Sequence, residues 1–295
     1  MTGRSEGLAL ESLWSAAESP ISEVDARGGE LPAALAARYK GNLTIDLQPD
    51  RPTIVANFVS SLDGVVALGK SEPNAGGGEI SGFSEADRYM MALLRGLADV
   101  VIVGAGTLRV GRHHVWTAAH VQPALAGAFA AWRAELGLTP QPTTIVVTAS
   151  GNLDATHSGL NQPGVPVIVV TTRAGAKHLA TLPFSPNVRI EAVGDGADVS
   201  AAALLDVISG TGARLALCEG GPHLFGEILQ ARLVDELFLT LAPQVIGRDA
   251  TVHRLSFVEG TSFGGGHGRW TTLRSIRRAG DDLFLRYRFE PSPRA

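Results

Sequence analysis

The sequence predicts an α/β protein in which a mostly parallel sheet is covered by helices on both faces. Three observations predict this fold class. After residue 50, short strand-like runs alternate with helix-like runs. The strand-like runs, such as Val100–Val103, are continuously apolar, as expected where both faces of a strand are covered. The chain then ends in two strand-like stretches joined by a tight turn, which predicts an antiparallel hairpin at one side of the sheet.

Residues 1–50 differ from the rest and are expected to form an N-terminal extension to a domain at residues 51–295. Two short helices are expected here, at Leu8–Ala17 and Glu30–Tyr39, and Gly41 suits the end of the second. We expect the extension to pack on the outside of the main domain or on a partner subunit.

From residue 51 the helices and strands follow one another at short intervals. The predicted order is strand Thr53–Ser60, helix Ser84–Leu97, strand Val100–Val103, helix Ala124–Leu136, strand Thr144–Thr148, strand Val165–Val170, helix Ala174–Leu182, strand Val188–Val193, helix Val199–Ser209, strand Leu215–Cys218, helix Pro222–Gln230, strand Glu236–Leu241 and the hairpin strands Trp270–Ile276 and Leu283–Phe289. Ser84 with Asp87 three residues later is typical of a helix start, and Asp198 is placed to cap the helix at Val199.

The composition excludes several classes of protein. The 295-residue chain carries 25 basic and 29 acidic side chains, a net charge of −4, which argues against a generally basic nucleic-acid-binding protein. Its single cysteine, Cys218, forms neither an internal disulfide nor a cysteine-rich metal cage, so no metal is expected. No apolar run approaches the ~20 residues of a membrane-spanning helix, and the first residues lack the apolar core of a signal peptide. We therefore expect a cytoplasmic protein with a small-molecule partner.

Three predicted strands end in glycine or small polar residues, at Ser60–Gly64, Gly104–Thr107 and Glu219–Pro222. Ligands of open α/β sheets usually bind beyond the carboxyl ends of the strands. These three segments are therefore the candidate site.

The segment after Cys218 is the most informative of the three. Gly220 and Gly221 let a ligand approach the backbone, and Pro222 fits the first turn of a helix. The N–H groups at His223–Phe225 would then favour a phosphate. A buried carboxylate needs partners, so Glu219 suggests a hydrogen bond to a ligand. The alternative is a glycine-rich turn in which Glu219 caps the helix.

The other two segments are weaker signals. Gly104-Ala105-Gly106 resembles the start of a dinucleotide fingerprint, but Arg109 stands where the third glycine belongs. Asp63 either serves the site or caps the turn at Gly64. The chain contains neither a phosphate-binding P-loop nor a Gly-x-Ser-x-Gly elbow, and His113-His114 is expected on a solvated loop.

The motifs taken together resemble a known family, the reductase domain of riboflavin biosynthesis (RibD C-terminal type), whose fold is related to dihydrofolate reductase. The resemblance spans roughly residues 51–289. It is carried by Ser60-Ser61-Leu62-Asp63-Gly64, by the run from Leu94 to Thr107, by Glu219-Gly220-Gly221-Pro222, by Leu239-Thr240-Leu241-Ala242-Pro243 with Gly247, and by Leu283-Phe284-Leu285-Arg286-Tyr287.

The resemblance implies NADPH-dependent reduction of a ribosylaminopyrimidine phosphate by a homodimer. It implies substrate binding by Arg95 and Glu219, and catalysis by Glu219 and by Asp63 as a pocket support or a proton source. The implied cofactor-binding residues are Val59, Gly104, Gly106, Thr107, Ser150, Gly220, Gly221, Pro222, His223, Leu224 and Phe225.

The sequence departs from the family in two ways, and the second weakens the substrate assignment more than the cofactor assignment. The segment before Arg51 is too short for the deaminase domain that bacterial relatives carry, so a stand-alone reductase is expected. The acidic pair usual after the Gly-x-Gly-Thr segment is also missing. Arg109 and Arg112 stand there instead, either as phosphate or carboxylate ligands or as solvated side chains. The alternatives are therefore a dihydrofolate-like or other small-carbonyl reductase, or a non-catalytic NADPH-binding protein.

Overall fold

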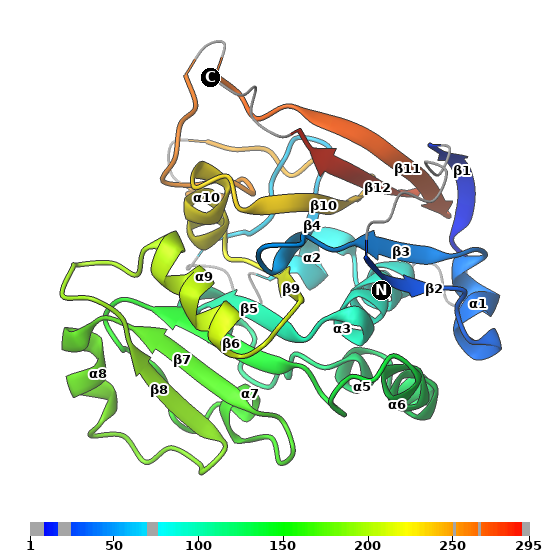
Figure 1. The fold of residues 1–295 in the computed structure, drawn as a ribbon. Coiled ribbons are helices and arrows are strands. Elements are labelled where there is room, and N and C mark those ends of the chain that lie inside the picture. Colours follow the sequence, from blue (N-terminus) through cyan, green and yellow to red (C-terminus); the bar gives the residue numbers. More distant parts are fainter. Residues whose placement is uncertain (1–8, 17–24, 70–75, 250–251, 265–266, 291–295) are drawn as a thin grey trace.

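The computed structural model describes residues 9–16, 25–69, 76–249, 252–264 and 267–290. One ten-stranded sheet runs through the molecule in the order β1-β11-β12-β10-β4-β9-β5-β6-β7-β8 (Figure 1). The pairs from β10 to β8 are parallel, and β12, β11 and β1 continue the sheet with antiparallel pairs. The mixed, mostly parallel sheet with a C-terminal antiparallel hairpin is thus confirmed.

The strands agree closely with the apolar runs of the sequence. Their bounds are β1 Glu11–Ser15, β4 Thr53–Ser60, β5 Val100–Gly104, β6 Thr143–Thr148, β7 Val167–Thr171, β8 Val188–Ala192, β9 Leu215–Cys218, β10 Val234–Leu241, β11 Thr271–Ala279 and β12 Asp282–Phe289. A separate two-stranded sheet pairs β2 Ala26–Gly29 with β3 Leu43–Asp46.

The helices cover both faces of the large sheet. Their bounds are α1 Ala33–Tyr39, α2 Gly77–Ser81, α3 Glu85–Leu97, α4 Ala105–Val110, α5 Ala118–Val121, the 3₁₀ helix η1 Pro123–Leu125, α6 Ala126–Glu135, α7 Ser158–Asn161, α8 Arg173–Leu179, α9 Ala201–Gly210 and α10 Pro222–Gln230. Helices α3, α5 and α6 lie on one face of the sheet, and α9 and α10 lie on the other (Figure 1). Apolar side chains of the first group belong to one core cluster and those of the second group to another.

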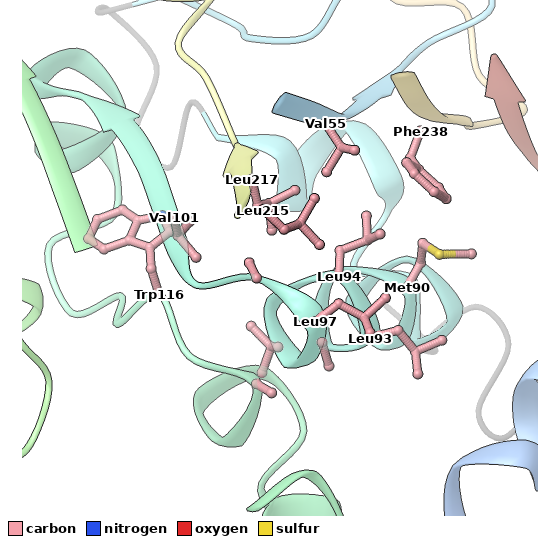
Figure 2. Packing of buried hydrophobic residues seen from close by; sticks show 14 of the residues in the cluster. Val55, Met90, Leu93, Leu94, Leu97, Val101, Trp116, Leu215, Leu217 and Phe238 are labelled. Atoms are coloured by element: carbon pink, nitrogen blue, oxygen red, sulfur yellow. The ribbon is translucent and has the colours of Figure 1, made fainter. Parts of the chain in front are cut away.

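Alternation along the central strands explains how one strand serves two cores. Val101 of β5 packs with α3, whereas its neighbour Ile102 packs with α9 and α10. Figure 2 shows Leu94 of α3 beside Leu215 and Leu217 of β9, in the same core cluster as Val101. Full burial of one such side chain contributes about 1.5–3 kcal/mol, so these contacts fix the helix that carries part of the site.

The N-terminal segment differs from the sequence expectation. The predicted helix Leu8–Ala17 is wrong between residues 9 and 16, while Leu8 and Ala17 themselves lie outside the described residues. Glu11–Ser15 is instead the strand β1, paired antiparallel with β11. All five of its side chains are exposed, so this strand has no buried apolar face and lacks the alternation of apolar and polar residues that predicts a strand. Its strand conformation comes from pairing with a distant part of the chain.

Smaller differences concern helix ends. Ser200, rather than Asp198, caps α9, because its hydroxyl accepts a hydrogen bond from the Ala203 N–H at 3.2 Å. The predicted second helix is confirmed but begins at Ala33. It ends at Tyr39, and Lys40 follows in a left-handed conformation, just before Gly41. No helix in the described part of the chain is long and apolar enough to cross a membrane.

Candidate active site

Three neighbouring strand ends form the candidate site. Strand β9 pairs in parallel with β4 on one side and β5 on the other, so the carboxyl ends of all three strands share one edge. The segments Ser60–Gly64, Gly104–Thr107 and Glu219–Pro222 follow these ends. The structure therefore brings together the three segments that the sequence singled out.

Two glycine-containing segments lie directly against each other: Gly104–Thr107, where β5 leads into the first turn of α4, and Gly220–Pro222, where β9 leads into α10. We call them the paired glycine turns. The N–H of Gly104 donates to the Gly220 carbonyl at 2.7 Å. A β-carbon at Gly104 would lie 3.3 Å from the Gly221 nitrogen, and one at Gly221 would lie 3.3 Å from Oγ1 of Thr107. Gly220 has φ +88°, a conformation that favours glycine. Glycine at these positions is therefore needed for the two turns to approach.

The second turn leads into helix α10 without a capping side chain. Gly221 occupies the N-cap, no side chain caps it in the described structure, and Pro222 takes the first helical position. His223 is exposed and Leu224 is half-buried, whereas the Phe225 ring lies in the core, 4.8 Å from the ring of Phe58. The first N–H groups of such a helix are available to an anion.

The remaining predicted cofactor residues lie around these turns. Val59 is near the end of β4, and a β-carbon at Gly77 would lie 3.0 Å from its Cγ1. Ser150 follows β6, is exposed, and accepts a hydrogen bond from the Asn152 N–H at 3.3 Å. The Arg109 guanidinium reaches the Asn152 carbonyl at 3.5 Å. Ser150 therefore lies one strand away from the paired glycine turns, beside Arg109.

A buried ion pair joins helix α3 to the end of β9. Arg95 Nε and NH2 donate to the two carboxylate oxygens of Glu219 at 2.8 and 2.6 Å. The side chains are only 1% and 7% exposed. Bidentate geometry fixes the plane of the carboxylate as well as its position. Glu219 is thus held rigidly beside Gly220.

Asp63 is an anchored carboxylate on the same edge. The Ser61 hydroxyl donates to its Oδ1 at 2.6 Å, and the N–H groups of Ile246 and Gly247 donate to its oxygens at 3.1 and 2.7 Å. These hydrogen bonds, that of Ser61 first, lower the pKa of Asp63 to about 2. Asp63 is ionised near neutral pH, which suits a support of the pocket better than a proton donor.

The expectation of a solvated loop at His113-His114 is wrong for His114. His113 is exposed, but His114 is half-buried, and its Nε2 lies 2.8 Å from Arg95 NH2. We name Arg95, His114 and Glu219 the charged cluster. The sequence signal for His114 was indirect: an arginine in the last turn of an apolar helix needs acceptors from elsewhere in the chain.

Asp87 is a second residue whose place the sequence analysis missed. It was predicted only as part of the helix start, and its N–H does donate to the Ser84 hydroxyl at 3.3 Å. Its carboxyl group, however, is buried beneath the site and is hydrogen-bonded to the side chains of Thr240 and Ser81. Burial raises the pKa of Asp87 to about 6. An aspartate three residues before Met90 on the apolar side of a helix was the available signal.

Comparison with known proteins assigns the chain to a family. A model of the RibD C-terminal domain matches residues 52–283. The chain belongs to the RibD C-terminal domain family. This confirms the resemblance drawn from the strand-end motifs.

Relatives in the RibD C-terminal domain family agree in sequence and fold. A 2,5-diamino-6-ribosylamino-4(3H)-pyrimidinone 5′-phosphate reductase from Methanothermobacter thermautotrophicus is 29% identical over 202 residues, which cover 68% of this chain and 82% of that protein. A pyrimidine reductase-like protein from Corynebacterium diphtheriae shares the fold with a TM-score of 0.63 and 20% identity, covering 82% of this chain and 93% of that one. The Thermotoga maritima deaminase/reductase has a TM-score of 0.59 and 17% identity, covering 81% of this chain and 57% of that one.

Proposed function

We propose that this protein is an NADPH-dependent reductase of a ribosylaminopyrimidine 5′-phosphate. The observation that carries the proposal is the buried, rigidly held Glu219 directly beside the paired glycine turns, in a chain of the RibD C-terminal domain family. The Methanothermobacter and Thermotoga relatives are both named as reductases of such compounds. Family and geometry together favour this substrate class over dihydrofolate.

The paired glycine turns fit a dinucleotide. Glycine at 104, 220 and 221 lets the two turns pack closely against each other, and α10 begins beside them without a side-chain cap. A pyrophosphate at this position would accept hydrogen bonds from the backbone and interact favourably with the helix dipole. Thr107 Oγ1, close to Gly221, adds a hydroxyl at the same point.

Bound NADPH would supply a hydride, and the overall reaction also consumes one proton. The sugar carbon that receives the hydride is most reactive as part of a positively charged iminium, formed when the ribosyl ring opens. The Glu219 carboxylate would stabilise that charge, because it is shielded from water and already fixed in place by its ion pair with Arg95. Asp63, with its lowered pKa, would hold the segment 61–64 against residues 246–247 to form one wall of the pocket.

The choice of NADPH over NADH is assigned to Arg109. This side chain is exposed and reaches the turn after β6 that carries Ser150, the residue expected near the adenosine end of the coenzyme. A guanidinium there would pair with the 2′-phosphate that distinguishes NADPH. Arg112 is 77% exposed and 3.8 Å from Asp154, which makes it the weaker candidate.

The test is NADPH oxidation by the purified protein with three acceptors. We expect turnover with a ribosylaminopyrimidine 5′-phosphate, followed by the absorbance of the reduced nicotinamide, and at least 100-fold less with dihydrofolate. Faster turnover of dihydrofolate or of a simple carbonyl compound would favour the other reductases. Tight NADPH binding without turnover of any acceptor would favour the non-catalytic alternative, and no NADPH binding would overturn the proposal.

We further propose that the protein works as a homodimer in the cytoplasm. Leu62, Phe83 and Val245 are exposed apolar side chains, and the Leu62 N–H donates to the Gln244 carbonyl, which places two of them together near the rim of the site. The single cysteine is buried and free, which fits a reducing compartment. A monomer mass in sedimentation at micromolar concentration would contradict the dimer.

A further inference from the structure

The five N–H groups of Arg95 all have protein acceptors. Nε and one NH2 hydrogen go to Glu219, as described above. NH1 donates to the carbonyls of Val115 and Thr117 at 3.3 and 3.2 Å. The second NH2 hydrogen goes to Nε2 of His114 at 2.8 Å. A guanidinium has five donors, so none remains for a substrate unless one of these bonds breaks.

The contact with His114 defines the state of that imidazole. Arginine only donates, so Nε2 of His114 must accept, and the ring must be neutral with its proton on Nδ1. The charged and titratable groups around it are Arg95 on α3, His120 on α5 and His157 next to α7. Burial, followed by Arg95, lowers the pKa of His114 to about 2. Neutral His114 is thus the stable form across the physiological range.

The segment that carries His114 is itself firmly held. Trp116 is buried and stacks on His157 with 5.9 Å between ring centroids. Nδ1 of His157 accepts from the Gly159 N–H, so its Nε2 donates to the Gly111 carbonyl at 2.8 Å. Residues 111–117 are therefore anchored at both ends, by His157 and by Arg95. This segment follows directly after the stretch that lacks the family's acidic pair.

We propose that His114 is a positioning residue of the active site, which accepts the last N–H of Arg95 and thereby holds the Glu219 carboxylate toward the substrate. The inference rests on the proposed function and deepens it. Without this acceptor, a buried Arg95 donor would be unsatisfied and the guanidinium would turn to find another partner. The carboxylate of Glu219 would turn with it, because the two groups are joined by two hydrogen bonds.

Kinetic tests compare three variants with the wild type. His114→Leu removes the acceptor at similar volume, His114→Gln keeps an acceptor oxygen, and His113→Leu changes the exposed neighbour. We expect His114→Leu to lower kcat of NADPH oxidation with the ribosylaminopyrimidine phosphate about 30-fold, with the Kd for NADPH changed less than twofold. His114→Gln should recover to within about fivefold of wild type, and His113→Leu should match wild type. Equal effects of His114→Leu and His113→Leu, or no recovery in His114→Gln, would overturn the proposal.

A spectroscopic test separates this inference from the proposed reaction. In ¹⁵N-histidine NMR spectra, the His114 signals, assigned by their loss in His114→Gln, should show the neutral Nδ1–H form unchanged from pH 5 to pH 8. Protonation of His114 within that range would overturn the inference even in an active enzyme. A neutral, non-titrating His114 in a protein that does not oxidise NADPH would instead overturn the reaction and leave the geometry of the charged cluster intact.

Discussion

The paired glycine turns and the charged cluster lie on one sheet edge but are built in opposite ways. The turns pack together through glycine and place the N-terminus of α10, which has no side-chain cap, beside the site. The charged cluster offers one carboxylate, and three elements are needed to hold it: α3, the segment 111–117 and the end of β9. Under the proposed function, coenzyme binding would therefore depend on the shape of the backbone, whereas chemistry would depend on the pairing of buried charges.

The free-energy cost of burying charged groups explains why the donors of Arg95 in the charged cluster are all paired within the protein. A buried ion pair gains little stability unless its remaining donors and acceptors are also paired. Arg95 meets this condition with five acceptors, and its side chain is 1% exposed. The turns bear no such cost, because neither Gly104–Thr107 nor Gly220–Pro222 contains a charged side chain. Substitutions in the two regions should therefore affect different measurements.

The largest expected effect is that of Glu219→Gln on turnover. Glutamine keeps the shape but loses the charge that would stabilise the iminium, so kcat should fall about 1,000-fold, or about 4 kcal/mol. The Kd for NADPH should change less than threefold, because the paired glycine turns are intact. The control is Glu227→Gln on the exposed side of α10, which should leave both quantities unchanged. A larger loss of NADPH affinity than of kcat would show that the two regions do not act separately.

The paired glycine turns could be predicted from the sequence because their signals are local. Gly104 follows the apolar run of β5, and Gly220-Gly221-Pro222 stands between a buried strand and an amphipathic helix. Parallel strands then bring such ends to one edge without further information. The same locality explains why most strand bounds were confirmed within one or two residues.

The charged cluster could not be predicted in full because its contacts join distant parts of the chain. Arg95 and Glu219 are 124 residues apart, and only the family resemblance linked them. Nothing local distinguishes His114 from exposed His113. Strand β1 was missed for the same reason, since its conformation depends on β11, more than 250 residues later.

The second prediction is that burial of the ionised Asp87 carboxylate beneath the site lowers the free energy of unfolding. The pKa of Asp87 is raised to about 6, so the folded state binds its proton more tightly than the unfolded state does. Stability must then fall as pH rises from about 4 to 6. Asp87→Asn removes this loss, and its free energy of unfolding should exceed that of wild type by up to about 3 kcal/mol at pH 8 and by about 1 kcal/mol at pH 4.5.

Urea unfolding at the two pH values measures this difference. Asp206→Asn, on the exposed side of α9, is the matched control and should stay within about 0.5 kcal/mol of wild type at both. An Asp87→Asn variant that is less stable than wild type at pH 8 would mean that the ionised carboxylate is well compensated. Buried charge beneath the site would then not lower the free energy of unfolding, and the two regions would not differ in this respect.

The third prediction concerns the glycine turns. Gly220→Ala places a β-carbon on a residue with φ +88° and 3.2 Å from the Phe58 ring, so the turn must shift. We expect the Kd for NADPH to rise about 30-fold, or about 2 kcal/mol, with kcat at saturating NADPH reduced less than fivefold. Gly210→Ala, where a β-carbon meets nothing within 4 Å, is the control. A change confined to kcat would place Gly220 with the charged cluster instead.

The smallest effect on the Kd for NADPH is expected at Arg109, where a side chain and not the backbone would contact the coenzyme. Arg109→Gln should raise the Kd for NADPH about fivefold, roughly 1 kcal/mol, because an exposed guanidinium–phosphate pair is screened by solvent. The Kd for NADH should not change, and the preference should decrease further at high salt. Arg173→Gln, equally exposed on α8, controls for loss of one positive charge. Equal weakening of NADH and NADPH binding would mean that Arg109 contacts the part common to both coenzymes and not the 2′-phosphate. The paired glycine turns would then not be sufficient to bind that common part through the backbone alone.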